Sequence, residues 1–319
     1  MSVLTTVIPL LGFALKTTAP PFLQVLIGMI AKRFGLLKEA LVNRLSRWTF
    51  NTAMPLVMFL WASQVDLSGV WRSGYLLSGV LSTLVIVIAA LGWARWRKFP
   101  PRHWGVFAQG AYRSNMGFIG IALCANAYGV EGLALAALPL ALWTMLYNVV
   151  AVWLLSQTLG NDVSVASVAT GVLRNPLILG ISGGLLFAVF EIPLPSVIRS
   201  AGASFTAVFL PFVLVLVGAS LSLKALQGAS RETFEACFWK LLVMPLVAVA
   251  IALLLQVRGT ELAIVFLLLA SPTATASFVM VAAYGGNGPM AANIVVLTTL
   301  CSIVTITFGL TVLQLSGLI

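Results

Sequence analysis

The sequence is poor in the residues from which soluble proteins build their surfaces and catalytic sites. Only 8% of its 319 residues are charged, whereas a soluble domain carries about 25%. It has one histidine, His103, and three widely separated cysteines without a C-x-x-C pair, which argues against a disulfide framework or a zinc site. The stretch GISGG at 180–184 fits the pattern G-x-S-x-G, but it lies inside an apolar run and is more readily explained by close helix packing. There is no pair of membrane aspartates, so we expect neither an enzyme nor a cofactor.

Acidic residues are scarce inside the apolar stretches as well. No aspartate or glutamate lies securely within one, so no proton relay or sodium site built on membrane carboxylates is visible. A coupling proton or sodium ion would have to use backbone carbonyls, hydroxyls or amides. A cationic substrate is also disfavoured.

Apolar residues, by contrast, make up 61% of the chain, and the mean hydropathy is +1.08. A helix needs about 20 apolar residues to cross a bilayer. The sequence therefore predicts an all-α polytopic membrane protein, with residues 1–15 as an apolar lead-in and no cleaved signal peptide. We expect ten transmembrane helices, near 17–33, 45–65, 73–94, 104–127, 132–157, 173–190, 203–222, 237–256, 261–284 and 289–315.

The basic residues are distributed unevenly over the two sides of these spans. The net charge of +10 comes from clusters between apolar runs, a pattern typical of cytoplasmic loops rather than of nucleic-acid binding. The loops after odd-numbered spans hold 13 basic residues against 4 on the other side, and Arg113 within a span completes the 18. This bias predicts an inner (plasma) membrane protein with both termini outside the cytoplasm. The 13 are Lys32, Arg33, Lys38, Arg44, Arg47, Arg95, Arg97, Lys98, Arg102, Arg174, Lys224, Arg231 and Lys240.

An internal repeat appears when the sequence is shifted by 156 residues. Because five spans are an odd number, the second copy would enter the membrane from the opposite face, as in many secondary transporters. The prediction is a repeat over 1–157, a cytoplasmic junction over 158–171 and an inverted repeat over 172–319. The coinciding residues are Pro20 with Pro176, Gly28 with Gly184, Pro55 with Pro211, Tyr128-Gly129 with Tyr284-Gly285, and Gly132 with Gly288.

Two spans carry helix-breaking residues at the same repeat position. The fourth contains Arg113-Ser114-Asn115-Met116-Gly117, and the ninth contains Ser271-Pro272-Thr273. The shift aligns Asn115 with Ser271, and both residue types favour helix N-caps. We therefore expect spans 4 and 9 to break and restart near mid-membrane, with Asn115 and Ser271 capping the second half-helices and Pro272 at a first helical position.

Two restarting helices and a buried arginine favour anion binding. Each restart exposes unpaired N–H groups and about half a positive charge, and arginine can hold a carboxylate with two hydrogen bonds. The candidate substrate-binding residues are Arg113, Ser114, Asn115, Gly117, Ser271, Pro272, Thr273 and Thr275.

Structural explanations for the same residues stay open. Arg113 could satisfy backbone carbonyls or a neighbouring asparagine, and Pro272 could be a simple kink. Intramembrane asparagines such as Asn148 are more readily explained as interhelical contacts than as ligands.

The stretches RSNMGFIGIALCANAYG, from Arg113, and SPTATASFVMVAAYGGNGPMAANIVVLTT, from Ser271, resemble the auxin efflux carrier family. This family includes plant PIN auxin exporters and bacterial malate or malonate permeases. The resemblance implies a support bundle and a transport bundle, each drawing helices from both repeats, with broken helices 4 and 9 crossing at Asn115 and Pro272. The short junction fits a compact bacterial-type carrier of dicarboxylates or related carboxylates.

Together these features predict a secondary transporter that moves a small organic anion across the lipid bilayer by alternating access. A sodium-coupled bile-acid-type symporter and a non-transporting membrane sensor are the alternatives. The sequence leaves open the exact substrate, the direction, the coupling ion and whether the chain forms a homodimer.

Overall fold

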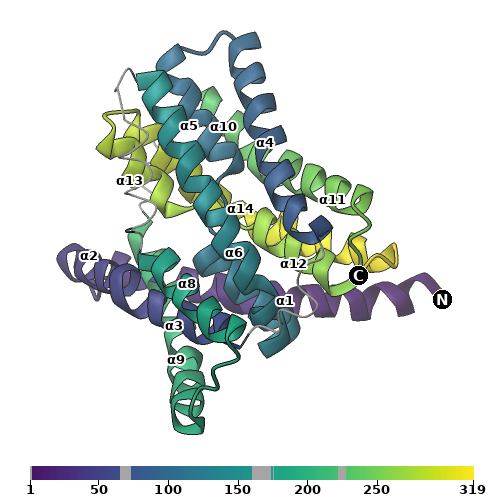
Figure 1. Ribbon diagram of the computed structural model, residues 1–319. Coiled ribbons are helices and arrows are strands. Elements are labelled where there is room, and N and C mark those ends of the chain that lie inside the picture. Colours follow the sequence, from purple (N-terminus) through teal and green to yellow (C-terminus); the bar gives the residue numbers. More distant parts are fainter. Residues whose placement is uncertain (1, 65–72, 160–173, 175, 222–227) are drawn as a thin grey trace.

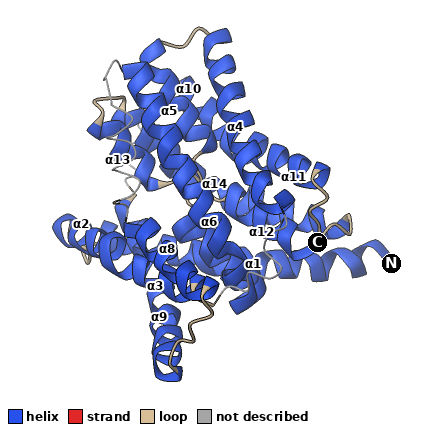
Figure 2. Ribbon diagram, in the orientation of Figure 1, coloured by secondary structure: helices blue, strands red, loops and turns tan. Residues whose placement is uncertain are grey.

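The computed structural model describes residues 2–64, 73–159, 174, 176–221 and 228–319. Within these ranges the regular secondary structure is helical, apart from one isolated two-residue bridge (Figure 2). The outward faces of the helices carry large apolar side chains such as Ile88, Leu246 and Phe308, which are 71%, 68% and 69% exposed. Such faces need lipid around them. The chain is a polytopic membrane protein.

Each of the ten predicted spans coincides with a helix or an interrupted helix of the described chain. Six of the described helices are long and apolar enough to cross a membrane by length and composition, and two shorter apolar helices cover Ile178–Val189 and Gly259–Ala270. The number of crossings thus remains a prediction. In chain order the elements are α1 (Ser2–Arg33), α2 (Glu39–Trp48), η1 (Thr49–Ala53), α3 (Met54–Ala62), α4 (Ser73–Trp96), α5 (Pro101–Tyr112), η2 (Met116–Gly120), α6 (Ile121–Leu159), α8 (Pro176–Val189), α9 (Ser196–Ser220), α10 (Arg231–Phe238), η4 (Trp239–Val243), α11 (Met244–Leu254), α12 (Gly259–Ala270), α13 (Thr275–Ala283) and α14 (Gly288–Leu315).

The ends of the predicted first repeat are placed as follows. The lead-in 1–15 is no separate element, because α1 continues from Ser2 to Arg33 through its internal prolines Pro9, Pro20 and Pro21. Residues 158 and 159 of the predicted junction end α6. The remainder of that junction lies outside the described residues.

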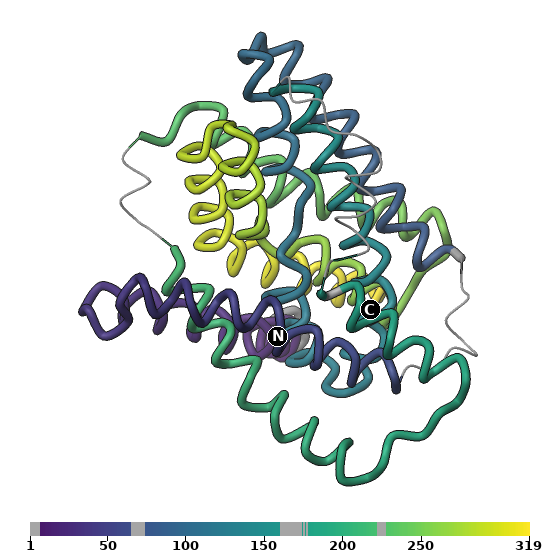
Figure 3. Tube along the Cα trace, turned by 60° about the vertical axis from the view of Figure 1, so that its left-hand side comes forward, coloured from purple at the N-terminus to yellow at the C-terminus, as the bar shows by residue number. Residues whose placement is uncertain are grey.

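The helices gather into two groups (Figure 1). One contains α1, α2, α3, α8 and α9, in which α1 packs on α9 and α3 packs on α8. The other contains α4, α5 and α10 to α14, and α13 lies beside α14 (Figure 3). Helix α6 contacts both groups, since it packs against α1, α3 and α8 as well as α5 and α12.

Small residues let the backbones of the first group approach closely. A Cβ atom added to Gly28 of α1 would meet the backbone of α9 at Val215, and one added to Gly184 of α8 would meet the carbonyl oxygen of Phe59 in α3. Close backbone approach is the usual basis of helix association in lipid. These two glycines are one of the pairs related by the shift of 156 residues.

A second related pair ends two helical segments. Gly129 has φ +58° and ψ −137° and interrupts α6, and Gly285, which follows the C-cap residue Tyr284 of α13, has φ +72°. Such backbone angles favour glycine, which lacks the Cβ that would clash there.

Candidate functional site

The first break lies between α5 and η2. Helix α5 ends at Tyr112, and Arg113 adopts an extended conformation with φ −77° and ψ 93°. Asn115 occupies the N-cap position before Met116, as predicted, but its side chain accepts no capping hydrogen bond. The predicted break is therefore confirmed, whereas the predicted capping hydrogen bond of Asn115 is absent.

The second break is longer than predicted. Helix α12 ends at Ala270, and α13 begins only at Thr275 with Ala274 at its N-cap position. The predictions that Ser271 caps the second half-helix and that Pro272 occupies its first position are therefore wrong. The Ser271 hydroxyl instead donates a 2.7 Å hydrogen bond to the carbonyl of Leu268, so it closes the preceding helix.

The two breaks cross and pair through their backbones. Extended segments have free N–H and C=O groups, which need partners when buried. Thr298 of α14 contributes from the side, because its hydroxyl accepts a 3.1 Å hydrogen bond from the Thr273 N–H. The paired contacts are an antiparallel bridge of Ser114 with Thr273, a 2.7 Å hydrogen bond from the Asn115 N–H to the Pro272 carbonyl, and a 2.9 Å hydrogen bond from the Ala274 N–H to the Arg113 carbonyl.

Arg113 is buried beside this crossing, with 5% of its surface exposed. Its guanidinium donates a 2.7 Å hydrogen bond to Oδ1 of Asn148 and a 3.3 Å hydrogen bond to the carbonyl of Tyr147. A backbone carbonyl and a neighbouring asparagine are the partners expected if Arg113 has a structural role. Both acceptors are neutral, and the ion pairs found among the described residues do not include Arg113. The guanidinium is therefore hydrogen-bonded, but no carboxylate among the described residues neutralises its charge.

Lys240 was assigned to a cytoplasmic loop, and that assignment is wrong. The residue lies in the π-helical turn η4 with no exposed surface. Its ammonium donates a hydrogen bond to the Ser114 hydroxyl and another, of 2.9 Å, to the carbonyl of Leu269. Without it, 12 basic residues remain on that side against 4, so the predicted orientation is unchanged. A second buried cation thus contacts the crossing.

The sequence held one signal for Lys240. It falls inside the apolar run predicted for span 8, and α10, η4 and α11 form one apolar stretch from Arg231 to Leu254. A basic residue near the end of such a run is ordinarily at the interface. The π-helical turn, which precedes Pro245 and its missing N–H donor, places this one inside.

A cavity of about 80 Å³ lies against the crossing. Of the eight candidate residues, five line it: Arg113, Ser114, Asn115, Gly117 and Thr275. The remaining three, Ser271, Pro272 and Thr273, support the crossing from outside its lining, and the Thr273 hydroxyl donates a 2.8 Å hydrogen bond to the Gly110 carbonyl. The opposite wall includes Phe50 and Met54 from η1 and α3.

Asn115 offers this cavity an unused donor. The residue is 4% exposed, and its Nδ2 has no hydrogen-bond partner among the described residues. A buried amide left in this way costs free energy. Its presence beside Arg113 is a reason to expect that something with acceptor atoms binds there.

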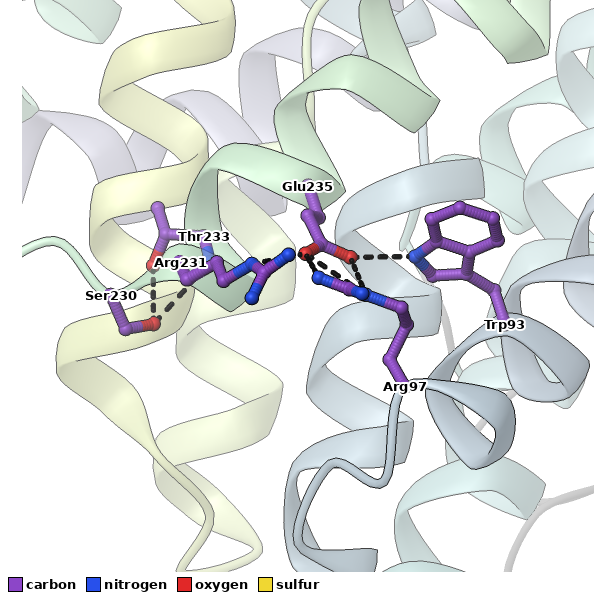
Figure 4. Close-up of polar contacts among 6 residues, drawn as sticks. All are labelled: Trp93, Arg97, Ser230, Arg231, Thr233 and Glu235. Carbon is purple, nitrogen blue, oxygen red and sulfur yellow. Dashed lines mark hydrogen bonds and ion pairs between the residues drawn. The ribbon is translucent and has the colours of Figure 1, made fainter.

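A second polar cluster lies outside the crossing and ties α4 to α10 (Figure 4). Glu235 accepts hydrogen bonds from Trp93 at 2.6 Å, Arg97 at 2.8 Å and Arg231 at 3.0 Å. The neighbouring hollow of about 510 Å³ is lined mainly by aromatic side chains. Because the charged groups of this cluster already satisfy one another, we assign it to packing rather than to a binding site.

Two crossed, interrupted helices beside a buried cavity define a membrane transport protein, since irregular backbone at membrane depth is tolerated where it lines such a site. The comparison with known proteins agrees. Residues 13–310 match the model of the family described as membrane transport protein, and the chain belongs to this family, that of the auxin efflux carriers.

Two archaeal relatives have a similar length. An uncharacterized transporter of Methanothermobacter thermautotrophicus is 25% identical over 296 residues, which cover 91% of this chain and 95% of the relative. One from Methanocaldococcus jannaschii is 26% identical over 303 residues, covering 92% and 94%. The similarity therefore extends over the whole architecture.

Proposed function

We propose that the chain is a secondary transporter that carries a small organic anion by alternating access, with a carboxylate bound in the cavity at the crossing. The observation that carries this proposal is the pair of buried cations, Arg113 and Lys240, which have only neutral oxygen ligands among the described residues. Buried charges are normally paired. An anionic substrate would supply the missing negative charge.

The donors around the cavity support the same class of substrate. The Arg113 guanidinium and the unpartnered Asn115 Nδ2 are both in its lining. Thr275, the first residue of α13, adds the electropositive end of a helix whose first N–H groups lack intrahelical acceptors. A carboxylate can accept hydrogen bonds from all three.

The cavity is too small for a whole dicarboxylate, so transport requires the helices around it to move. About 80 Å³ accommodates a few water molecules, and thus a carboxylate group with little more attached. A dicarboxylate needs additional room. Met54 belongs to α3 of the group of α1, α2, α3, α8 and α9, and Phe50 to η1, which packs against α2, α3 and α8 of that group. Movement of this group against the crossing would therefore enlarge and expose the cavity. We assign this group as the support bundle.

The organisation around the site is part of the proposal. We propose inverted repeats over 1–157 and 172–319, a location in the inner membrane, and termini outside the cytoplasm. The equivalent roles of Gly28 and Gly184, and of Gly129 and Gly285, support the repeat.

The test combines ligand binding with flux. Purified protein is screened by thermal shift against mono- and dicarboxylates, auxins and bile acids at constant ionic strength, and the best ligand is then followed into liposomes. Removing a charge-assisted hydrogen bond costs about 1.5–3 kcal/mol, so Arg113→Gln should weaken binding by about 10- to 100-fold. Arg113→Lys should recover part of this loss.

The matched control is Arg199→Gln, because Arg199 is an exposed arginine on α9. It should bind and transport like the original chain. Equal transport by Arg113→Gln would remove Arg113 from the site, and the absence of binding and flux for every carboxylate would refute the proposed function.

A further inference from the structure

Lys240 carries a second inference, which concerns the coupling ion. Its side chain is fully buried in η4, and its ammonium contacts two oxygen atoms, the hydroxyl of Ser114 and the carbonyl of Leu269. Within the described chain no carboxylate forms an ion pair with it. An ammonium held by a hydroxyl and a carbonyl uses the same kind of neutral oxygen ligands as a small metal cation.

The position of these oxygens is informative. Leu269 lies in the last turn of α12, where the break after Ala270 leaves carbonyls without intrahelical donors and the helix dipole is negative. Ser114 belongs to the other broken helix. In sodium-coupled carriers, carbonyls from the ends of half-helices and from unwound backbone coordinate the coupling ion.

The two neighbouring residues of the first break serve different partners. Arg113 donates to Asn148 and Tyr147, whereas Ser114 accepts from Lys240 and donates a 2.8 Å hydrogen bond to Leu269. The crossing therefore has an anion-seeking cavity and, beside it, a set of cation-binding oxygens that is already occupied by Lys240.

We propose that the ammonium of Lys240 is a built-in replacement for a coupling sodium ion at the crossing, so that the transporter works without sodium. A sodium ion would bind and leave during each cycle, whereas the lysine side chain is covalently attached and stays. Together with Arg113 it gives the crossing two basic side chains, which suit a dicarboxylate. The inference rests on the proposed function only in taking the crossing as the centre of transport.

The first test needs no substrate. Thermal unfolding of the purified protein and of Lys240→Ala is compared in sodium chloride and in choline chloride at equal ionic strength. The original chain should have the same midpoint in both salts. Lys240→Ala should unfold at a lower temperature in choline and regain part of the difference in sodium, because the ion enters the vacated oxygen site. A sodium-specific shift of the original chain, or none for Lys240→Ala, would overturn the proposal.

A second variant covers the case in which Lys240→Ala does not fold. Lys240→Gln keeps hydrogen-bond donors and most of the volume but removes the charge, and the exposed Lys38 provides the control Lys38→Gln. Dicarboxylate uptake into liposomes should be sodium-independent for the original chain and for Lys38→Gln. It should fall about tenfold or more for Lys240→Gln, as expected from losing a charged hydrogen bond. Undiminished uptake by Lys240→Gln would refute the need for the charge.

The two proposals can fail separately. If no carboxylate is transported by the original chain, the proposed function fails, while the sodium comparison in thermal unfolding still decides the role of Lys240. If carboxylates are transported only in the presence of sodium, the substrate class stands and the role of Lys240 is refuted.

Discussion

The close contact of α1 with α9 makes a strong prediction about Gly28. A Cβ at this position would lie 2.8 Å from the carbonyl carbon of Val215 and 2.9 Å from the backbone nitrogen of Ala219. Carbon atoms in contact are normally about 3.5 Å apart or more. The carbonyl oxygen of Val215 would be closer still. Because all three neighbours are backbone atoms, Gly28→Ala would force the two helices apart by at least roughly 0.7 Å.

The magnitude follows from two opposing contributions. Overpacking of this kind costs about 1–3 kcal/mol, whereas alanine in a helix interior gains about 1 kcal/mol over glycine. The difference is about 0–2 kcal/mol, and because the clash is with backbone atoms we expect Gly28→Ala to be destabilised by about 2 kcal/mol, the upper end of this range. The midpoint of thermal unfolding in detergent should fall by a few degrees.

Gly12 is the matched control, because it lies in the same helix and a Cβ there meets no atom within 4 Å. Gly12→Ala should gain the helix propensity without the clash, so its midpoint should equal or exceed that of the original chain. A midpoint for Gly28→Ala as high as for Gly12→Ala would show that the close α1–α9 approach is not present in the protein.

Three further predictions concern other parts of the chain. Gly129→Ala should lower the unfolding midpoint by the equivalent of about 1–3 kcal/mol. A Cβ there would clash with no neighbouring atom, but φ of +58° is strained for alanine. An unchanged midpoint would contradict the observed backbone. Thr298→Val should lower the free energy of unfolding by about 1–3 kcal/mol, because it leaves the buried Thr273 N–H without its acceptor. Thr298→Ser keeps the hydroxyl and should have the midpoint of the original chain. An unchanged midpoint for Thr298→Val would show that this bond is unimportant. Glu235→Gln, which weakens the ion pair with Arg97, should cost less than about 1 kcal/mol since both groups are partly exposed; the loss should shrink with added salt, and a salt-independent loss would point to a packing effect instead.

The positions of the two breaks could be predicted because local chemistry determines them. Asn115 comes two residues after the charged Arg113 inside an apolar run, and Pro272 removes a backbone donor, so each marks an interruption. Their equivalence under one constant shift strengthened both predictions. Even so, the sequence placed the first residue of the second half-helix at Pro272, three residues before α13 begins at Thr275. Residues 272–274 pair with the other break, and that tertiary contact cannot be seen in the local pattern.

Lys240 shows the opposite limit. Counting basic residues treats a lysine near the end of an apolar run as a loop residue, which is correct for most such positions. Whether its long side chain extends outward to the interface or inward to a carbonyl depends on the neighbouring helices. Asn148 was likewise expected to join helices, and its partner is Arg113. Partners 29 residues or more apart in the sequence decided both cases.

The reciprocal hydrogen bonds that join Arg113 to Ala274 and Asn115 to Pro272 have a mechanical consequence. Each helix is hydrogen-bonded to the other at the point where its own helical hydrogen bonds are interrupted. A displacement of one interrupted helix would therefore move the other with it. A substrate bound at the crossing under the proposed function would then move with both interrupted helices as one unit, and neither helix would open the site independently of the other.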